Sequence, residues 1–345
     1  HFGYIKRQPM DVYKLQKRGG RGVSGMKHRD EDFVEELFIS STHENVLFIT
    51  TKGKMYKLKC YEIPEGSKSS IGMNIVNILP LSEGEKVAAM LKTSDFDEGR
   101  FIIMVTKNGK IKRTPLSAYK NVRKNGLIAI GLDEGDEIAG VRLTDGNCEI
   151  MVATHEGRAI RMNENQMRSL SRAAHGVRAI KLRDGDFVVS MARIREGATV
   201  LTVTERGLGR RCEIESYPLR NRGGYGVLNY KVSDEKGYVC GIKVVDEQDD
   251  IIMIANDGVI IRIRACDVRV MGRYSTGVRL MRVNGEETKV VTFTRAEHED
   301  DVEIAEVEQP SDEEIAKELE LEKLEAEKEL SEPDAVAEEP EETIE

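Results

Sequence analysis

The segment Ile102-Ile103-Met104-Val105-Thr106-Lys107-Asn108-Gly109 joins a run of apolar and β-branched residues to a polar pair that ends in glycine. Such runs favour β-strands, and Asn-Gly favours the tight turn of a β-hairpin, because glycine adopts positive φ without steric cost. The same pattern recurs at intervals of about fifty residues, with the hairpin glycine at Gly3, Gly53, Gly109, Gly157, Gly207 and Gly258. We therefore predict a protein built from six repeats.

Two more glycines recur in the repeats and mark further turns. A glycine followed by an apolar residue stands at Gly22, Gly72, Gly126, Gly176, Gly226 and Gly277. A turn glycine between two strand-like runs stands at Gly84, Gly135, Gly185, Gly237 and Gly285, and the first repeat has Asp30-Glu31-Asp32 there instead. Each repeat thus predicts four antiparallel strands, although the opening strand of the first repeat would lie upstream of His1.

Four strands in each of six repeats predict an all-β fold, a six-bladed, propeller-like ring of four-stranded antiparallel blades. The Trp-Asp signature of WD40 repeats is absent, since the chain has no tryptophan. We place the ring at residues 1–296 and a separate tail at residues 297–345. The expected blades are about 1–44, 45–99, 100–147, 148–197, 198–248 and 249–296.

The net charge of -9 is distributed unevenly along the chain. Residues 297–345 hold 23 acidic and 3 basic residues, a net charge of -20, which leaves +11 for residues 1–296. The tail is poor in apolar residues, so we expect most of it to be disordered. One short helix is indicated where the capping-box pattern Ser311-Asp312-Glu313-Glu314 precedes Ile315 and Leu319. Two interpretations stay open, a solubilising tail and a tail that regulates the basic ring by competition.

Several classes of protein are excluded by what the sequence lacks. No run approaches the roughly 18 apolar residues of a membrane helix, and the first residues form no signal peptide. The five cysteines are scattered and never spaced as CxxC, which predicts neither a disulfide framework nor a zinc site and fits the reducing cytoplasm. No HExxH or G-x-S-x-G motif is present, so we expect no catalysis, metal or cofactor in this chain. The missing initiator Met suggests a piece of a longer protein.

A basic residue stands four positions after every hairpin glycine. These six register residues are Arg7, Lys57, Arg113, Arg161, Arg211 and Arg262. Further basic residues lie beside them or in the long loops, namely Lys110, Lys112, Arg158, Arg210, Arg123, Lys124, Arg222 and Arg273. Equivalent positions of a ring form a belt, so we predict a rim that contacts phosphates of double-stranded DNA without reading bases. The alternative is that these charges only protect strand edges against pairing.

The densest motif, which we call the box, is Gln16-Lys17-Arg18-Gly19-Gly20-Arg21-Gly22. Its match to G-x-G-x-x-G is a false dinucleotide fingerprint, because it lies in the loop of a β repeat and not between a strand and a helix. Glycines let backbone N–H groups approach a phosphate, and basic side chains surround them here, so we predict a DNA-binding loop. The alternative is a flexible loop. The fifth repeat echoes the motif as Arg222-Gly223-Gly224-Tyr225-Gly226.

The box resembles the motif Q-R/K-R-G-G-R/K-G of the C-terminal domain of DNA gyrase A subunits, and the repeats and acidic tail are similar to that family too. The resemblance implies a six-bladed β-pinwheel whose blades exchange strands. It implies chiral wrapping of duplex DNA around a basic rim, with the box required, in support of ATP-dependent negative supercoiling. It also implies that the catalytic tyrosine lies upstream, that this fragment is non-catalytic, and that ATP and Mg belong to other domains, ATP to the B subunit of an A2B2 holoenzyme.

Two alternatives to this function stay open. One is an accessory domain like that of topoisomerase IV, which guides DNA without tight wrapping; the intact box at Gln16–Gly22 counts against it. The other is a propeller that serves as a protein-interaction scaffold, with a rim that binds acidic partners.

Overall fold

A computed structural model describes residues 3–8, 40–67, 70–257, 259–283, 285 and 287–297. The chain divides into a unit of His1–Glu299 and a unit of Asp300–Glu345, and every described residue belongs to the first. The acidic tail and the helix predicted after Ser311 therefore lie outside the described residues. Within the described part, no helix has the length and apolar character needed to cross a membrane.

The second repeat shows how each repeat is built. Strands β2 (Asn45–Thr50) and β3 (Lys54–Lys59) form a hairpin in which Phe48 pairs with Tyr56, and β5 (Val87–Thr93) pairs with the other edge of β2. All residues of β2 are buried, as its apolar run predicts. The equivalent strands of later repeats are β6 (Phe101–Thr106), β7 (Lys110–Pro115), β9 (Ile138–Thr144), β10 (Glu149–Thr154), β11 (Arg158–Asn163), β13 (Val188–Arg193), β14 (Thr199–Thr204), β15 (Leu208–Glu213), β17 (Val239–Val245), β18 (Asp249–Ala255), β19 (Ile260–Arg264) and β21 (Val290–Glu297).

The fourth strand of a sheet comes from the following repeat. In the sheet of order β5-β2-β3-β8, the outer strand β8 (Leu127–Ile128) belongs to the third repeat. The strands β12 (Val177–Arg178), β16 (Val227–Leu228) and β20 (Val278–Arg279) join the preceding sheets in the same way. The four strands predicted per repeat are thus divided between two sheets. A strand of two residues adds little stability alone and is held where it completes its neighbour's sheet.

The all-β, propeller-like fold is confirmed, but the described residues hold five large sheets and not six. Four of these have four strands, and the sheet β19-β18-β21 has three. The first repeat contributes β1 (Tyr4–Ile5), which pairs with β4 (Met73–Asn74) of the second repeat. Most of the rest of the first repeat, residues 9–39, lies outside the described part.

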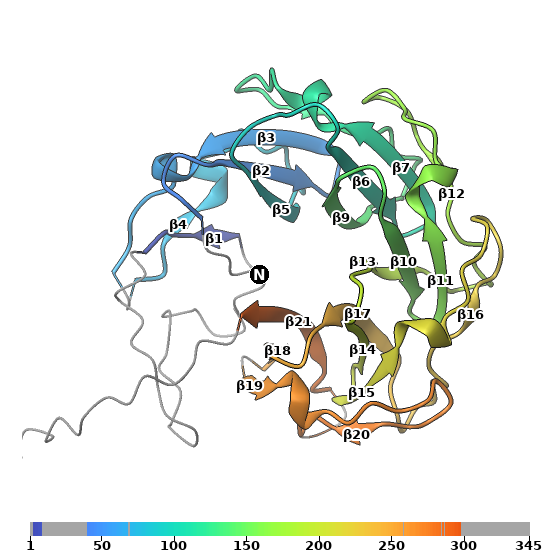
Figure 1. Ribbon diagram of the computed structural model, residues 1–345. Coiled ribbons are helices and arrows are strands. Elements are labelled where there is room, and N and C mark those ends of the chain that lie inside the picture. The colour runs from blue at the N-terminus through green and yellow to red at the C-terminus, as the bar shows by residue number, and fades with distance from the viewer. Residues whose placement is uncertain are drawn as a thin grey trace, which may run out of the picture. The chain divides into compact units, whose positions relative to one another are not determined.

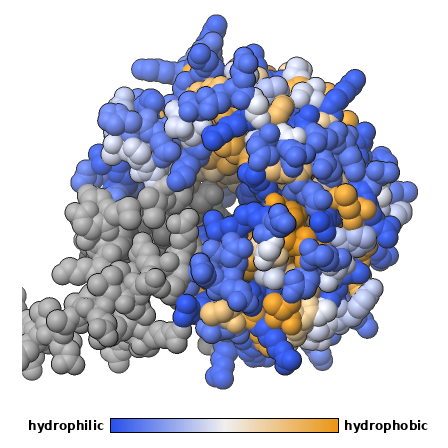
Figure 2. All heavy atoms as spheres, in the orientation of Figure 1, coloured by the Kyte–Doolittle hydropathy of each residue, from blue (hydrophilic) through white to orange (hydrophobic). Residues whose placement is uncertain are grey.

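The sheets follow one another around a common centre, with β9, β13, β17 and β21 towards that centre and β12, β16 and β20 at the periphery (Figure 1). The hydrophobic core lies between neighbouring sheets, where Ile103 of the third repeat packs in one cluster with Ile150 of the fourth. Hydrophilic residues cover most of the visible periphery (Figure 2). Each repeat therefore depends on its neighbours for burial, as in other repeat proteins.

Candidate nucleic-acid interface

Five of the six register residues bind the backbone of the following repeat. Arg161 on β11 is typical, since its Nη1 donates to the carbonyls of Ile214 at 3.0 Å and Tyr217 at 3.2 Å. Equivalent bonds run from Arg7 to the Ile63 carbonyl, from Lys57 to that of Lys120, from Arg113 to that of Glu164 and from Arg211 to that of Val268. The acceptors lie within or directly after the short 3-10 turns η2 (Cys60–Glu62), η4 (Leu116–Tyr119), η5 (Glu164–Gln166), η6 (Ile214–Ser216) and η7 (Ala265–Asp267). We call this contact the inter-repeat clasp.

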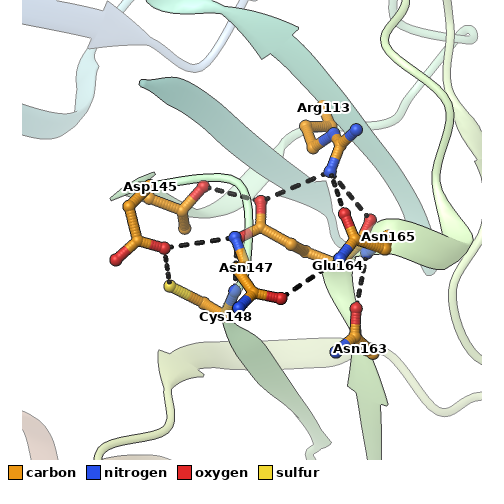
Figure 3. Close-up of polar contacts among 8 residues, drawn as sticks. Arg113, Asp145, Asn147, Cys148, Asn163, Glu164 and Asn165 are labelled. Atoms are coloured by element: carbon orange, nitrogen blue, oxygen red, sulfur yellow. Dashed lines mark hydrogen bonds and ion pairs between the residues drawn. The ribbon is translucent and has the colours of Figure 1, made fainter. Parts of the chain in front are cut away.

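Ion pairs and an aromatic contact also hold the register residues in place. Figure 3 shows Arg113 reaching Glu164 and Asn165 of the next repeat, and its guanidinium lies 4.5 Å from the centre of the Phe101 ring. Arg161 also forms an ion pair of 2.6 Å with Glu149. Arg262 has no clasp partner among the described residues and pairs with Asp250 of β18, leaving 51% of its side chain exposed.

The fixed register of these charges therefore has a structural explanation that the sequence analysis missed. The repeats place this basic side chain at equivalent positions, so the same hydrogen bond can form in each. A backbone carbonyl of the next repeat accepts that hydrogen bond as a DNA phosphate would. The spacing itself carried the signal, because it places each register residue on the second strand of a hairpin whose turn contacts the following repeat, as at Gly157 and Arg161. Arg211, only 3% exposed, does not lie on the surface where a DNA belt was expected.

Lys112 and Arg210 are fully buried, which corrects their expected place on the rim. The Lys112 ammonium donates to the carbonyls of Ala129, Ser171 and Arg172, and burial lowers its pKa to about 7. Arg210 donates to the carbonyls of Asn229 in its own repeat and Arg273 in the next, and its guanidinium lies 4.7 Å from the centre of the Tyr230 ring. Carbonyl oxygens accept hydrogen bonds from both cations and offset part of the cost of burying them, although Nη1 of Arg210 is buried without a partner among the described residues.

The remaining residues predicted beside the register residues differ in accessibility. Lys110 is half-buried and forms an ion pair with Asp133. Arg158 is half-buried and forms no ion pair with a described carboxylate. Neither contributes a fully exposed charge to the periphery.

The long loops before the peripheral strands carry the accessible charge. We call the basic residues there the outer-loop basic residues: Arg123, Lys124, Arg168, Arg220, Arg222, Arg269 and Arg273. The first six are exposed and form no ion pair with any described carboxylate. Arg273 is half-buried between the rings of Tyr217 and Tyr274 and donates to the Leu228 carbonyl. The box lies within residues 9–39, outside the described part, so its placement stays a prediction.

A second polar cluster, not predicted from the sequence, is formed by Asp145, Cys148 and Glu164, whose ligand-type atoms lie within 4.8 Å of one another (Figure 3). Glu164 accepts hydrogen bonds from the Cys148 N–H and the Thr144 hydroxyl, and Asp145 accepts from the Cys148 thiol and from Arg193. Burial raises the pKa of the Cys148 thiol to about 11, so it keeps its proton at neutral pH. These hydrogen bonds give the cluster a structural role, because they connect the turn at Asp145–Cys148 to Glu164 in η5.

Comparison with known proteins identifies the family. A family model described as the DNA gyrase C-terminal domain, a β-propeller, matches residues 1–41, 44–94, 100–145, 149–195, 198–246 and 249–294. The chain belongs to this family. Its six matched segments include the first repeat, most of which lies outside the described residues. The resemblance drawn from the box and the repeats is confirmed.

Relatives and solved structures agree with the family. The chain is 44% identical over 312 residues to the DNA gyrase A protein of Clostridium acetobutylicum, covering 90% of this chain and 38% of the relative. It is 36% identical to the DNA gyrase A protein of Escherichia coli, covering 93% of this chain and 37% of the relative.

A solved structure of a DNA gyrase A C-terminal domain matches with a TM-score of 0.73 at 25% identity, covering 85% of this chain and 96% of that chain. One of a DNA topoisomerase IV C-terminal domain matches with a TM-score of 0.72 at 26% identity, covering 86% and 91%. The chain thus spans less than two fifths of the curated relatives' length.

Proposed function

We propose that this domain binds duplex DNA without sequence specificity and wraps it around its periphery, in support of ATP-dependent negative supercoiling by DNA gyrase. The observation that carries the proposal is the row of outer-loop basic residues on successive repeats, six of which are exposed and without carboxylate partners among the described residues. A backbone-contacting surface of this kind binds phosphates whatever the base sequence. The net charge of +11 on residues 1–296 supports the same partner.

The rest of the enzyme belongs to the proposal as well. The catalytic tyrosine would lie in the part of the gyrase A protein that this chain does not cover, and this domain would itself be non-catalytic. ATP and Mg would bind elsewhere in an A2B2 assembly with the gyrase B protein. All five cysteines are free, which fits a cytoplasmic location.

Salt dependence of DNA binding tests the interface. We expect the logarithm of the association constant to fall linearly with the logarithm of salt concentration, because phosphate contacts release counterions. Replacing Arg123, Lys124 and Arg222 by Gln should reduce the slope by about 0.9 for each phosphate that the variant no longer neutralises. The control variant replaces Lys107 and Arg193, which already pair with Glu137 and Asp145, and should leave the slope nearly unchanged. Equal slopes in all three proteins would contradict the assignment.

Topology measurements on the same proteins separate wrapping from mere binding. After relaxation of a plasmid with the domain bound, chiral wrapping leaves a signed change in linking number. Replacing Arg18 and Arg21 of the box by Ala should abolish this change while the circular dichroism spectrum stays that of a β protein. Binding without any linking-number change in the unaltered domain would favour the topoisomerase IV-like alternative, and loss of DNA binding altogether would favour a protein-interaction scaffold.

A further inference from the structure

The loop before β16 in the fifth repeat has the same R-G-G-x-G order as the box, in the segment Arg222–Gly226. The fourth repeat holds this loop firmly in place. Gly223 N–H donates to the Ala179 carbonyl at 2.6 Å, and the Gly224 carbonyl accepts from Lys181 N–H at 2.9 Å. Arg222 N–H donates to the Gln166 side chain at 2.9 Å. The loop is therefore arranged in advance of any partner.

The loop borders a surface hollow of about 670 Å³. Its lining includes Leu219, Arg220, Asn221, Gly224 and Tyr225. Leu219 and Tyr225 are exposed, Tyr225 to 46%, and the Lys181 ammonium lies 4.8 Å from the centre of the Tyr225 ring. No carboxylate lines the hollow among the residues that the structure describes. A partner that fits must therefore be anionic and must also offer apolar surface.

Gly224 points to a close external contact. Its φ lies outside the left-handed region, and a Cβ built there would meet nothing within 4 Å, so neither the backbone nor the packing of the described residues requires glycine. The neighbouring Gly226 is different, because its φ is +67° and a Cβ would lie 2.3 Å from the Ala159 carbonyl. The N–H groups of Gly224 and Tyr225 have no hydrogen-bond acceptor among the described residues. Glycine at position 224 leaves these donors open to a ligand that approaches the backbone.

We propose that this hollow is a second anchor for the DNA backbone, independent of the box. A phosphodiester group would accept hydrogen bonds from the backbone N–H groups of Gly224 and Tyr225, with Arg220 and Lys181 supplying charge. The adjoining deoxyribose would pack on Tyr225 and Leu219. A nucleic-acid strand fits better than an acidic protein, because the hollow sets basic groups and N–H donors beside the exposed apolar surfaces of Leu219 and Tyr225, and each nucleotide offers an anionic phosphate beside an apolar sugar face. The inference rests on the proposed function and adds a specific site to it.

The test is Gly224→Val, which adds a branched side chain to the wall of the hollow, where the new Cβ meets no described atom within 4 Å. We expect about tenfold weaker binding of a short duplex at low salt, a smaller salt slope and an unchanged melting temperature. The control is Ala88→Val, which introduces the same side chain at an exposed residue of the inner strand β5 and should bind DNA normally. Combining Gly224→Val with Arg18→Ala and Arg21→Ala should give additive losses, because separate anchors act independently.

The outcomes distinguish this inference from the proposed function. If the unaltered domain fails to bind DNA, the proposed function is wrong. If it binds and Gly224→Val binds equally well, the domain contacts DNA elsewhere and the second anchor is wrong. Inorganic phosphate added at constant ionic strength should leave duplex binding unchanged; strong competition would mean that the hollow is a site for free phosphate.

Discussion

Arg161 shows how one side chain links two repeats. It lies on β11, yet its guanidinium ends on the carbonyls of Ile214 and Tyr217 in the following repeat while Glu149 balances its charge. Hydrogen bonds from a charged donor are worth about 1.5–3 kcal/mol each when they are desolvated. Arg113 and Arg211 make the same kind of contact in their own repeats. A basic residue in this register therefore stabilises the contact between two repeats, whether or not it also contacts DNA.

Lys112 provides a prediction at this scale, because its pKa is lowered to about 7 in the fold from an ordinary value of 10.5. Between these two pH values the unfolded chain binds a proton that the folded chain lacks. The free energy of unfolding should therefore rise with pH through this window, by at most about 1.4 kcal/mol per pH unit. At pH values below the folded pKa of about 7, burial of the charged ammonium should lower the free energy of unfolding by its full amount. Urea unfolding of the domain at a series of pH values measures this rise.

The matched variant is Lys112→Arg, since Arg210 occupies the equivalent position in the fifth repeat. A guanidinium does not titrate in this range, so the variant should lack the component of the rise that belongs to Lys112. Other titrating groups, such as Tyr119 with its pKa raised to about 12, are common to both proteins and cancel in the difference. Identical pH profiles would show that Lys112 keeps its proton throughout.

The two-residue outer strands explain why glycine recurs at fixed places. At Gly157 the hairpin between β10 and β11 touches the next repeat, and a Cβ there would lie 2.1 Å from the Tyr230 carbonyl. The carbonyl of Gly157 in turn accepts hydrogen bonds from the N–H groups of Asn229 and Tyr230. Strand exchange thus brings two backbones so close that only glycine fits between them.

A comparison of Gly157 with Gly185 separates the stability cost of this close approach from the cost of backbone strain. Gly157 and Gly185 have nearly equal φ values of +79° and +80°, but a Cβ at Gly185 would meet nothing within 4 Å. We expect Gly185→Ala to cost about 1–2 kcal/mol from the left-handed conformation alone. Gly157→Ala should cost at least about 2 kcal/mol more, because the backbone of the next repeat must move. Thermal and urea unfolding give both values, and equal losses would contradict the proposed role of strand exchange in packing.

At the scale of the whole molecule, the charge is divided between a ring of +11 and a tail of -20. We predict that deleting residues 300–345 tightens DNA binding, because the tail competes with phosphates for the outer-loop basic residues. The gain should shrink as salt rises and screens the attraction. A tail of equal length made of Gly and Ser is the control that separates charge from length. Unchanged or weaker binding after deletion would leave only the solubilising role.

Much of the fold could be predicted from the sequence because its signals are local. Alternating apolar runs, turn glycines and a period of about fifty residues depend only on neighbours along the chain, and they led to the all-β propeller. The exposed charges of the outer loops, such as Arg123 and Lys124, were also found correctly as exposed positions. Their contact with DNA stays a prediction.

The sequence alone determined the number of repeats, the strands, the turns and the separation of basic ring from acidic tail. Only the tertiary structure decided which sheet each outer strand completes and which charges face solvent. Lys112 and Arg210 look like surface residues along the chain, yet carbonyls from residues far away in sequence enclose them. Such contacts join different repeats, and the repeat period is the same whether a strand stays in its own sheet or crosses to its neighbour's. Whether a charged side chain is buried depends on whether the outer strand joins the neighbouring sheet, and no local sequence pattern encodes that choice.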